Sequence, residues 1–227
     1  MKIKNGIFII TAICLLLPYS IFFLATDNQI FFLTKEDGLF ETAGAIFFLL
    51  TAILFLIKFL KNKNFIFLLL SFIFLLGFCE EISWGQRIFN ISTPQFYEEI
   101  NRQKEINIHN LKFFPGEIGE ESRKGIWALM PAVDRMFSLF WFTYCCFLPI
   151  LYKLHSKTKR LLNQINFPIV PISLGVLFIS NYLLSKIIGP FITDTFHNPL
   201  VEIKEYNFAL LFFIVSFWFN QNSNTVT

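Results

Sequence analysis

The chain has 227 residues, of which 55% are hydrophobic and 32 are Phe, and its mean hydropathy is +0.57. Several apolar runs approach or exceed the roughly 20 residues with which a helix spans a bilayer. Because these runs are continuous rather than alternating, they favour helices over the strands of a β-barrel. We therefore expect an all-α integral membrane bundle that forms a single domain over residues 1–227.

Six transmembrane helices are expected, at about 7–25, 39–60, 65–88, 130–152, 167–189 and 206–220. The first run follows Lys2 and Lys4 as a signal peptide would, but it is long and lacks a clear small-x-small cleavage site. It is therefore expected to be a retained helix. A long extracytoplasmic loop, about 89–129, separates the third span from the fourth, and its segment 93–106 has the pattern of a surface helix.

The charges are divided between the two sides of the expected membrane. Nine of the nineteen Lys and Arg residues lie before the first span, at the turn between the second and third spans (58–63) or at the turn between the fourth and fifth (153–160), where no acidic residue occurs. The other ten share the remaining segments with all sixteen acidic residues. The positive-inside rule then places both termini in the cytoplasm of a multi-pass inner-membrane protein. The basic turns suit topology signals and contacts with membrane lipids, and nothing indicates nucleic acid as a partner.

Acidic residues lie deep in spans that are otherwise apolar. Glu80 is the sixteenth residue of a run that opens at Phe65, about 22 Å into a hydrocarbon layer about 30 Å thick. A charge within that layer costs on the order of 2.5–3.5 kcal/mol. Similar counting from the cytoplasmic lysines predicts one outer layer of charged residues, made up of Glu41, Glu80, Glu81, Arg87, Asp134 and Arg135.

Helical spacing groups these residues further. At 100° per residue, Glu80, Ser83, Trp84 and Arg87 share one face of the third span. On the fourth span, one face carries Asp134, Ser138, Trp141 and Cys145. Both faces are too polar for lipid, so we expect them to point into the bundle around a pocket that opens to the outer side.

Two interpretations of this layer remain open. The acids and arginines could form buried ion pairs that only fix helix packing. Alternatively, the four carboxylates of Glu41, Glu80, Glu81 and Asp134, which outnumber the two arginines, could serve proton transfer or cation binding. Glu80 is expected to matter for function more than for folding, and Glu36, in the first outer loop, is expected to be neutral when changed.

The candidate roles follow from residue type. The four carboxylates are candidates for general acid/base catalysis, Arg87 and Arg135 would hold an anionic headgroup, and Trp84 and Trp141 would pack on the substrate. His109 and His197 are outer-side candidates for the same pocket, whereas His155 lies in a cytoplasmic turn, which excludes a three-histidine zinc site. No HExxH, GxSxG or Walker motif occurs, so no metal or cofactor is assigned.

The run Cys-Glu-Glu-Ile-Ser-Trp-Gly-Gln-Arg-Ile-Phe (79–89), then Thr93-Pro94 and Glu-Ile-Asn-Ile-His-Asn-Leu (105–111), resembles a bacterial family of small multi-spanning membrane proteins. The resemblance implies a bacterial inner-membrane protein and attaches no activity. Membrane hydrolases of the ceramidase and progestin-receptor type also combine acids, a serine and histidines. This chain lacks their histidine pattern, so their zinc chemistry is not carried over.

The sequence thus favours a membrane-embedded enzyme that acts at the outer leaflet on a lipid, a lipid-linked substrate or a small molecule. The alternative is a transporter or a non-catalytic accessory or binding subunit in which the same carboxylates carry protons or cations. A transport path needs polar groups on the cytoplasmic side as well. The inner halves of three spans are almost wholly apolar at 47–57, 65–76 and 147–151, which favours a one-sided site.

Overall fold

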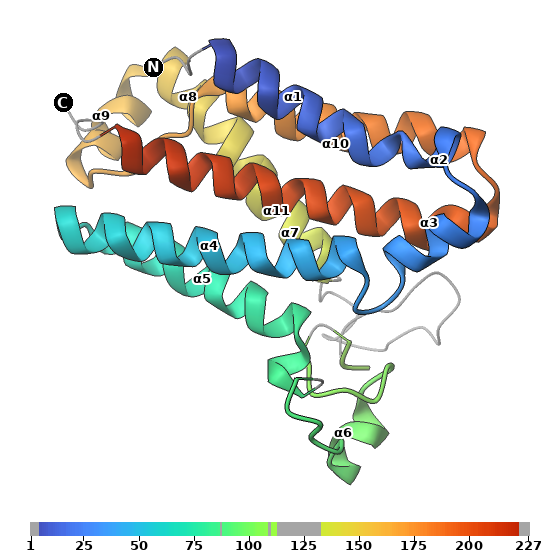
Figure 1. The fold of residues 1–227 in the computed structure, drawn as a ribbon. Helices are drawn as coiled ribbons and strands as arrows, with labels where there is room; N and C mark the ends of the chain where they lie inside the picture. Colours follow the sequence, from blue (N-terminus) through green and yellow to red (C-terminus); the bar gives the residue numbers. More distant parts are fainter. Residues whose placement is uncertain (1–4, 87, 109, 113–132, 223–227) are drawn as a thin grey trace, which may run out of the picture.

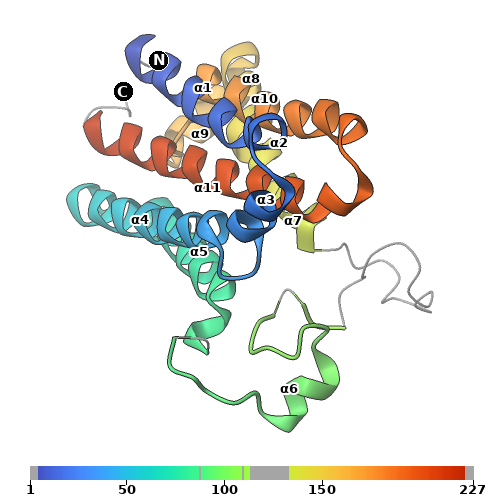
Figure 2. The same ribbon diagram turned by 45° about the vertical axis from the view of Figure 1, so that its right-hand side comes forward.

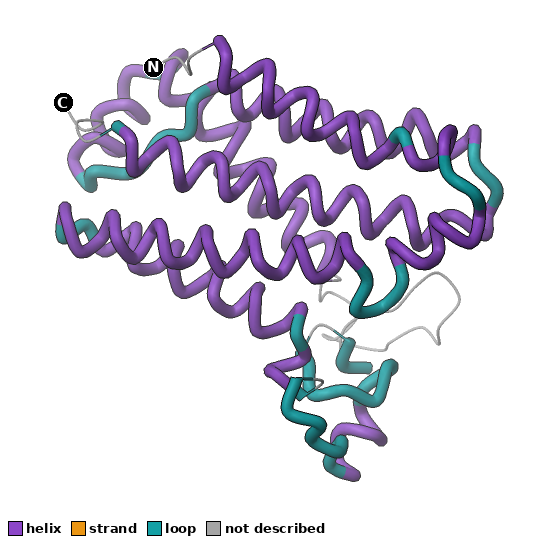
Figure 3. The backbone as a smooth tube through the Cα atoms, in the orientation of Figure 1, coloured by secondary structure: helices purple, strands orange, loops and turns teal. Residues whose placement is uncertain are grey.

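The computed structural model describes residues 5–86, 88–108, 110–112 and 133–222, and for Asn5 and Asp134 it describes the backbone only. Over these residues the chain is all-helical, as the sequence predicts, and they contain no strand (Figure 3). Three stretches are long and apolar enough to cross a membrane, namely Asp27–Asn62, Arg135–Leu154 and Ile172–Phe191, and Gly6–Tyr19 is a shorter apolar helix.

Five long helices run side by side along one axis. They are α1 (Asn5–Tyr19), α4 (Leu39–Asn62), α5 (Phe65–Glu81), α10 (Ile172–Ile188) and α11 (His197–Gln221). In both Figure 1 and Figure 2, α11 lies in the middle, with α4 and α5 on one side and α1 and α10 on the other. A sixth element crosses behind them and consists of α7 (Val133–Trp141), the π-helical segment η3 (Phe142–Phe147) and α8 (Leu148–Leu154).

Shorter elements connect the long ones at the two ends of the bundle. At one end lie the turn between α4 and α5 and the helix α9 (Ser156–Gln164), close to where α1 begins and α11 ends (Figure 1). The opposite end holds α2 (Ile21–Leu24), α3 (Asp27–Thr34), η4 (Gly189–Phe191) and η5 (Asp194–Phe196). The basic connections identified in the sequence therefore share one end, and the acidic helix ends share the other.

Phenylalanine rings fill the centre of the bundle. Phe212 of α11 lies at its middle, and its ring centroid is 4.6 Å from that of Phe74 on α5 and 4.9 Å from that of Phe178 on α10. Phe55 and Phe219 are fully buried further along the same core. Tilted and edge-on ring pairs at these distances add to the apolar burial, so the high phenylalanine content supplies the packing between helices.

The π-helical segment has a local cause. Pro149 has no N–H with which to continue the hydrogen-bond ladder, and the helix widens over the preceding residues 142–147. Gly175 of α10 packs directly on the carbonyl oxygen of Cys145 in this segment, and a Cβ at that position would overlap it. A residue without a side chain is therefore required where α10 crosses the widened turn.

Three expected boundaries were wrong. The third helix ends at Glu81 rather than near 88, because Ser83, Trp84 and Gly85 all have positive φ and the short 3₁₀ turn η1 (Ser83–Gly85) follows. The last helix begins at His197 rather than near 206. The expected surface helix at 93–106 is reduced to α6 (Gln95–Ile100), because Asn101 is extended.

Candidate functional site

A pocket of about 310 Å³ lies where the first turns of α4, α7 and α11 meet the last turns of α5. Its polar side carries six glutamates, three from the region of α4 and α5 that sequence analysis indicated and three that it did not. These are Glu36, Glu41, Glu80, Glu81, Glu202 and Glu205. Among the described lining residues there is one cation, Lys204, whose Nζ lies 3.8 Å from Glu205 Oε1. Among the described lining residues, acidic side chains therefore outnumber basic ones.

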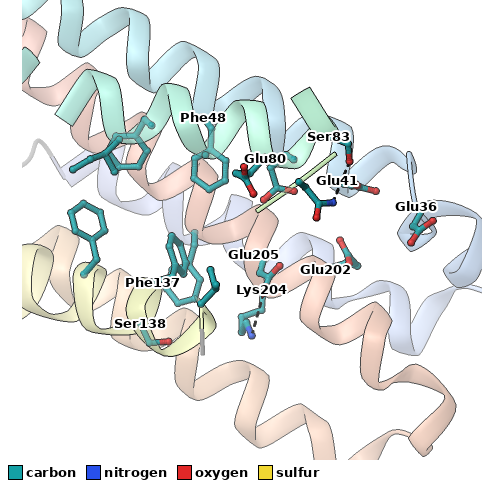
Figure 4. Close-up of a pocket in the computed structure, with 18 of the residues that line it drawn as sticks. Glu36, Glu41, Phe48, Glu80, Ser83, Phe137, Ser138, Glu202, Lys204 and Glu205 are labelled. Atoms are coloured by element: carbon teal, nitrogen blue, oxygen red, sulfur yellow. Dashed lines mark hydrogen bonds and ion pairs between the residues drawn. The ribbon is translucent and has the colours of Figure 1, made fainter. Parts of the chain in front are cut away.

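The other side of the pocket is apolar. Figure 4 shows the labelled acids gathered at one side, with Phe48 and Phe137 across from them. Phe74 and Phe140 also line the pocket, and both contact Phe212 in the core, at centroid distances of 4.6 and 5.7 Å. These rings close the pocket toward the centre of the bundle, so its lining is amphipathic, with an acidic side and an aromatic floor.

Glu80 is held by the loop that follows α5. Its Oε1 accepts a hydrogen bond from Trp84 Nε1 at 2.6 Å, and its Oε2 accepts one from the backbone N–H of Ile108 at 2.7 Å. The carboxylate therefore joins the end of α5 to residues 84 and 108. Because Glu80 carries these structural contacts, it is a weaker candidate for chemistry than the sequence suggested.

Glu81 has a different environment. Its side chain is half-buried and lines the pocket, and among the described residues it has neither a hydrogen bond nor an ion pair. The like charges of Glu205, Glu202, Glu41 and Glu80 act on it. A half-buried carboxylate close to other carboxylates is a recurrent feature of functional sites, because such an arrangement reduces stability unless something offsets it.

The loop beside the pocket is folded by its own amide side chains. Ser83 Oγ donates to Glu105 Oε2 at 2.5 Å, and Asn107 Nδ2 donates to the same oxygen at 3.1 Å. Gln86 Nε2 donates to Thr93 Oγ1 at 2.5 Å, while Gln86 Oε1 accepts from the N–H of Ile106 at 2.7 Å. The polar residues after Glu81 therefore bind the returning loop and do not extend a helical face.

The predicted site residues are only partly brought together. Glu41, Glu80, Glu81 and Ser138 line the pocket. Trp84 does not line it and is 44% exposed beside Glu80, and Trp141 is buried against Phe208. The expectation that Ser83 and Trp84 continue the helical face of Glu80 was wrong, because α5 ends at Glu81, although Ser83 still lines the pocket. Trp141 lies in α7 as expected, but it packs into the core and does not line the pocket.

Of the basic candidates, the structure describes Arg135 and His197, and neither lines this pocket. Arg135 is exposed on α7 and is absent from the pocket lining. His197 lines a second cavity of about 1120 Å³, which adjoins the first and shares Glu36, Gln103, Tyr182, Glu202 and Lys204 with it. That second cavity also carries Lys35 and Lys186. Arg87, His109 and the side chain of Asp134 lie outside the described residues.

Sequence reasoning missed Glu202 and Glu205 because it assigned them to a loop. Both precede an apolar run at 206–220, and their i, i+3 spacing would have put them on one face of a helix that started earlier. Glu36 was also missed: it lines both cavities and accepts a hydrogen bond from Gln103 Nε2 at 3.3 Å. It is therefore unsuitable as a neutral control.

Glu202 lies one turn before the expected span 206–220, at the border of the two cavities. Burial raises the pKa of its carboxyl to about 8, and the negative charges of Glu205, Glu41 and Glu36 add to the effect, while Lys204 opposes it. A carboxyl with this pKa changes its charge near neutral pH, at the rim of the acidic pocket.

No three His, Cys, Asp or Glu residues in the described part of the chain converge closely enough to hold a metal ion. The carboxylates surround the pocket instead of meeting at a point. Comparisons with protein-family models, with curated proteins and with solved structures found no match to this chain. The described residues define a class of protein by two features. The chain is all-helical, and three helical stretches are long and apolar enough to cross a membrane. Its pocket has an acidic side and a floor of phenylalanine rings.

Proposed function

We propose that the chain is a six-span protein of the bacterial inner membrane, with both termini in the cytoplasm and the acidic pocket facing outward. The division of charge along the sequence supports this topology. The shared end of the basic connections in the fold is consistent with it (Figure 1). The three apolar stretches would supply three of the spans, and α1, α5 and residues 206–220 of α11 the others.

Reporter fusions test this topology. Fusions at Asn62, at His155 and after the last residue are expected to behave as cytoplasmic, and fusions near Glu105 and His197 as exported. An exported reporter at His155 would contradict the proposal, because it would move the second basic turn to the outer side and separate the elements that form the pocket.

We further propose that the pocket binds an amphiphilic substrate that enters from the outer leaflet, and that Glu81 is its general acid/base. The observation that carries this proposal is the half-buried Glu81 carboxylate, which has no hydrogen-bond or ion-pair partner among the described residues and lies between other carboxylates and an aromatic floor. An apolar chain would pack on Phe74, Phe137 and Phe140, and the reacting group would lie at Glu81.

A transporter or accessory subunit is the second candidate, and the same carboxylates would then carry protons or cations. The closed aromatic floor argues against a continuous path, because Phe74, Phe140 and Phe212 occupy the space beneath the acids. The floor thus supports a site that is reached from one side only, which suits an enzyme or a binding subunit better.

The variant Glu81→Gln tests the role of the carboxylate. It removes a like charge from the acidic cluster, so the protein is expected to accumulate normally in the membrane while failing to restore the phenotype of a deletion strain. Glu98→Gln is the matched control, because Glu98 is exposed on α6 and does not line the pocket. If Glu81→Gln restores the phenotype fully, the acid/base role of Glu81 is wrong.

A further inference from the structure

The end of the bundle opposite the acidic pocket carries basic side chains and no acidic ones. The start of α1, the turn between α4 and α5, the helix α9 and the end of α11 meet there (Figure 1). The sequence has no Asp or Glu in residues 1–26, 42–79, 135–193 and 206–227, which contain all of these segments. The positive sign of the side-chain charge at this end therefore follows from the sequence itself.

The helix α9 combines this charge with exposed apolar side chains. Lys159 and Arg160 are exposed on it, and neither forms an ion pair among the described residues. Leu161 and Ile165, which lie on α9 and directly after it, are 60% and 51% exposed, whereas Leu162 is buried. A short surface helix with basic and exposed apolar side chains has the pattern with which helices bind an anionic membrane surface.

Hydrogen bonds fix α9 to the rest of the fold at both ends. At its start, His155 is extended, and its Nδ1 accepts a backbone N–H of the first turn. Tyr152 Oη of α8 donates to Asn163 Oδ1 at 2.9 Å. Asn64, at the start of α5, donates through Nδ2 to the carbonyl oxygen of Asn166 at 2.6 Å. The basic groups are therefore presented on a helix that is already ordered, which lowers the entropic cost of binding.

An open hollow on α9 offers space for a headgroup. Its volume is about 490 Å³, and its lining consists of Ser156, Lys159, Arg160, Asn163 and Gln164. The guanidinium of Arg160 can bind two oxygens of a phosphate, and the ammonium of Lys159 adds a second positive charge. The hydroxyl and the two amides can donate to the remaining oxygens. The donor set thus suits a phosphate group.

We propose that α9 binds the phosphate of an anionic phospholipid, with Lys159 and Arg160 on the headgroup and with Leu161 and Ile165 in the acyl region of the same leaflet. In the topology proposed above, this is the cytoplasmic leaflet, whose anionic lipids attract basic segments. A soluble phosphate ester has the same headgroup chemistry. The exposed leucine and isoleucine favour the lipid, because only a bilayer would remove them from water. The site does not depend on the role of Glu81.

Lipid binding can be measured on the full chain in a non-ionic maltoside detergent by its thermal unfolding. Phosphatidylglycerol and phosphatidylcholine are added at equal mole fraction of the micelles, and glycerol 3-phosphate is added at equal bulk concentration. The wild type is expected to be stabilised by phosphatidylglycerol and by neither of the others. In the double variant Lys159→Gln, Arg160→Gln, the apparent affinity for phosphatidylglycerol should fall roughly tenfold or more.

The basic turn between α4 and α5 supplies the matched control. Lys61 and Lys63 are exposed and do not line the hollow, so the double variant Lys61→Gln, Lys63→Gln removes the same charge from the same end of the bundle. It should keep the wild-type affinity for phosphatidylglycerol. A third double variant, Leu161→Ser, Ile165→Ser, changes exposed apolar side chains only. It should weaken lipid binding even if the variant at Lys159 and Arg160 does not fold.

Three results would overturn the proposal. Equal loss of affinity in the two charge variants would mean that the lipid responds to the overall charge of this end and not to α9. Stabilisation by glycerol 3-phosphate, with the Leu161 and Ile165 variant unaffected, would assign the site to a soluble phosphate ester. Stabilisation by phosphatidylcholine as strong as that by phosphatidylglycerol, or no shift with either lipid, would show that α9 does not select an anionic headgroup. None of these results bears on the acidic pocket, so the proposed function is tested separately.

Discussion

Two polar regions of this bundle differ in how their polar groups are satisfied. Between α1, α10 and α11, Asn181 Oδ1 accepts hydrogen bonds from Tyr19 Oη at 2.8 Å and from Asn207 Nδ2 at 3.1 Å, and Asn181 Nδ2 donates to the carbonyl of Lys204. These groups are neutral and buried. At the acidic pocket the groups are carboxyls that line open space, and Glu81 has no such contact among the described residues.

The amide groups between α1, α10 and α11 hold helices together, whereas the carboxyl groups of the pocket are available to a ligand. A neutral amide network in an apolar core fixes which helices meet and in what register, because any other arrangement leaves its donors unpaired. Clustered carboxylates do the opposite, since they repel one another and lower stability. Such a cluster persists where it serves something other than folding.

The largest effect is expected from breaking the neutral network. Asn181→Leu removes the acceptor of Tyr19 and of Asn207 in the core, where each buried group left without a partner costs about 1–3 kcal/mol. The variant should be the least stable of those discussed, by thermal unfolding in detergent, and should be lost from the membrane. A variant with unchanged stability would show that these hydrogen bonds do not hold α1 to α10 and α11.

A smaller loss is expected at Glu80. Gln at this position can accept from either Trp84 or Ile108 through its one oxygen, but it presents an N–H₂ group to the other donor. The cost should be about 1–3 kcal/mol and confined to the loop after α5. Limited proteolysis within residues 84–108 should therefore increase before the helices unfold. Glu98→Gln serves again as the control.

The sequence predicted that Glu80 matters more for function than for folding, and the structure gives it a structural role instead. The cause is the backbone conformation of the residues that follow α5. The sequence correctly predicted an all-helical chain and grouped Glu41, Glu80 and Glu81, which do line one pocket, because apolar run length and the position of a residue within a run depend only on residue order. It could not predict that Ser83 and Trp84 take positive φ. That departure redirects the residues after Glu81 into contacts with a loop more than twenty residues away.

The acids of α11 were missed for a related reason. Charged residues before an apolar run are typical of a loop at the membrane surface, and nothing local distinguishes that loop from an extra two turns of helix. In the fold, Ile203 and Leu200 are buried while Glu202 and Glu205 line the pocket, so the additional turns are amphipathic and packed. Only the neighbouring helices α4 and α5 make this pattern recognisable.

The last prediction concerns Glu202, and its effect is confined to the pH dependence of stability. Its carboxyl has an ordinary pKa of 4.5 and a pKa of about 8 in the fold, so the folded protein retains a proton that the unfolded chain releases over this interval. Stability from this group is therefore fully present below pH 4.5 and declines as pH rises toward 8, by at most about 1.4 kcal/mol per pH unit. Above pH 8 the penalty is complete, because the carboxyl is ionised in both states.

Glu202→Gln removes that proton-linked contribution. Melting temperatures in detergent between pH 5 and pH 8 should fall more steeply for the wild type than for the variant, and the variant should be the more stable of the two at pH 8. Subtracting one profile from the other cancels the titration of all groups that behave alike in both proteins. Parallel profiles would mean that Glu202 is solvated like a surface residue, and the contrast between the hydrogen-bonded amide network and the acidic pocket would then rest on Glu81 alone.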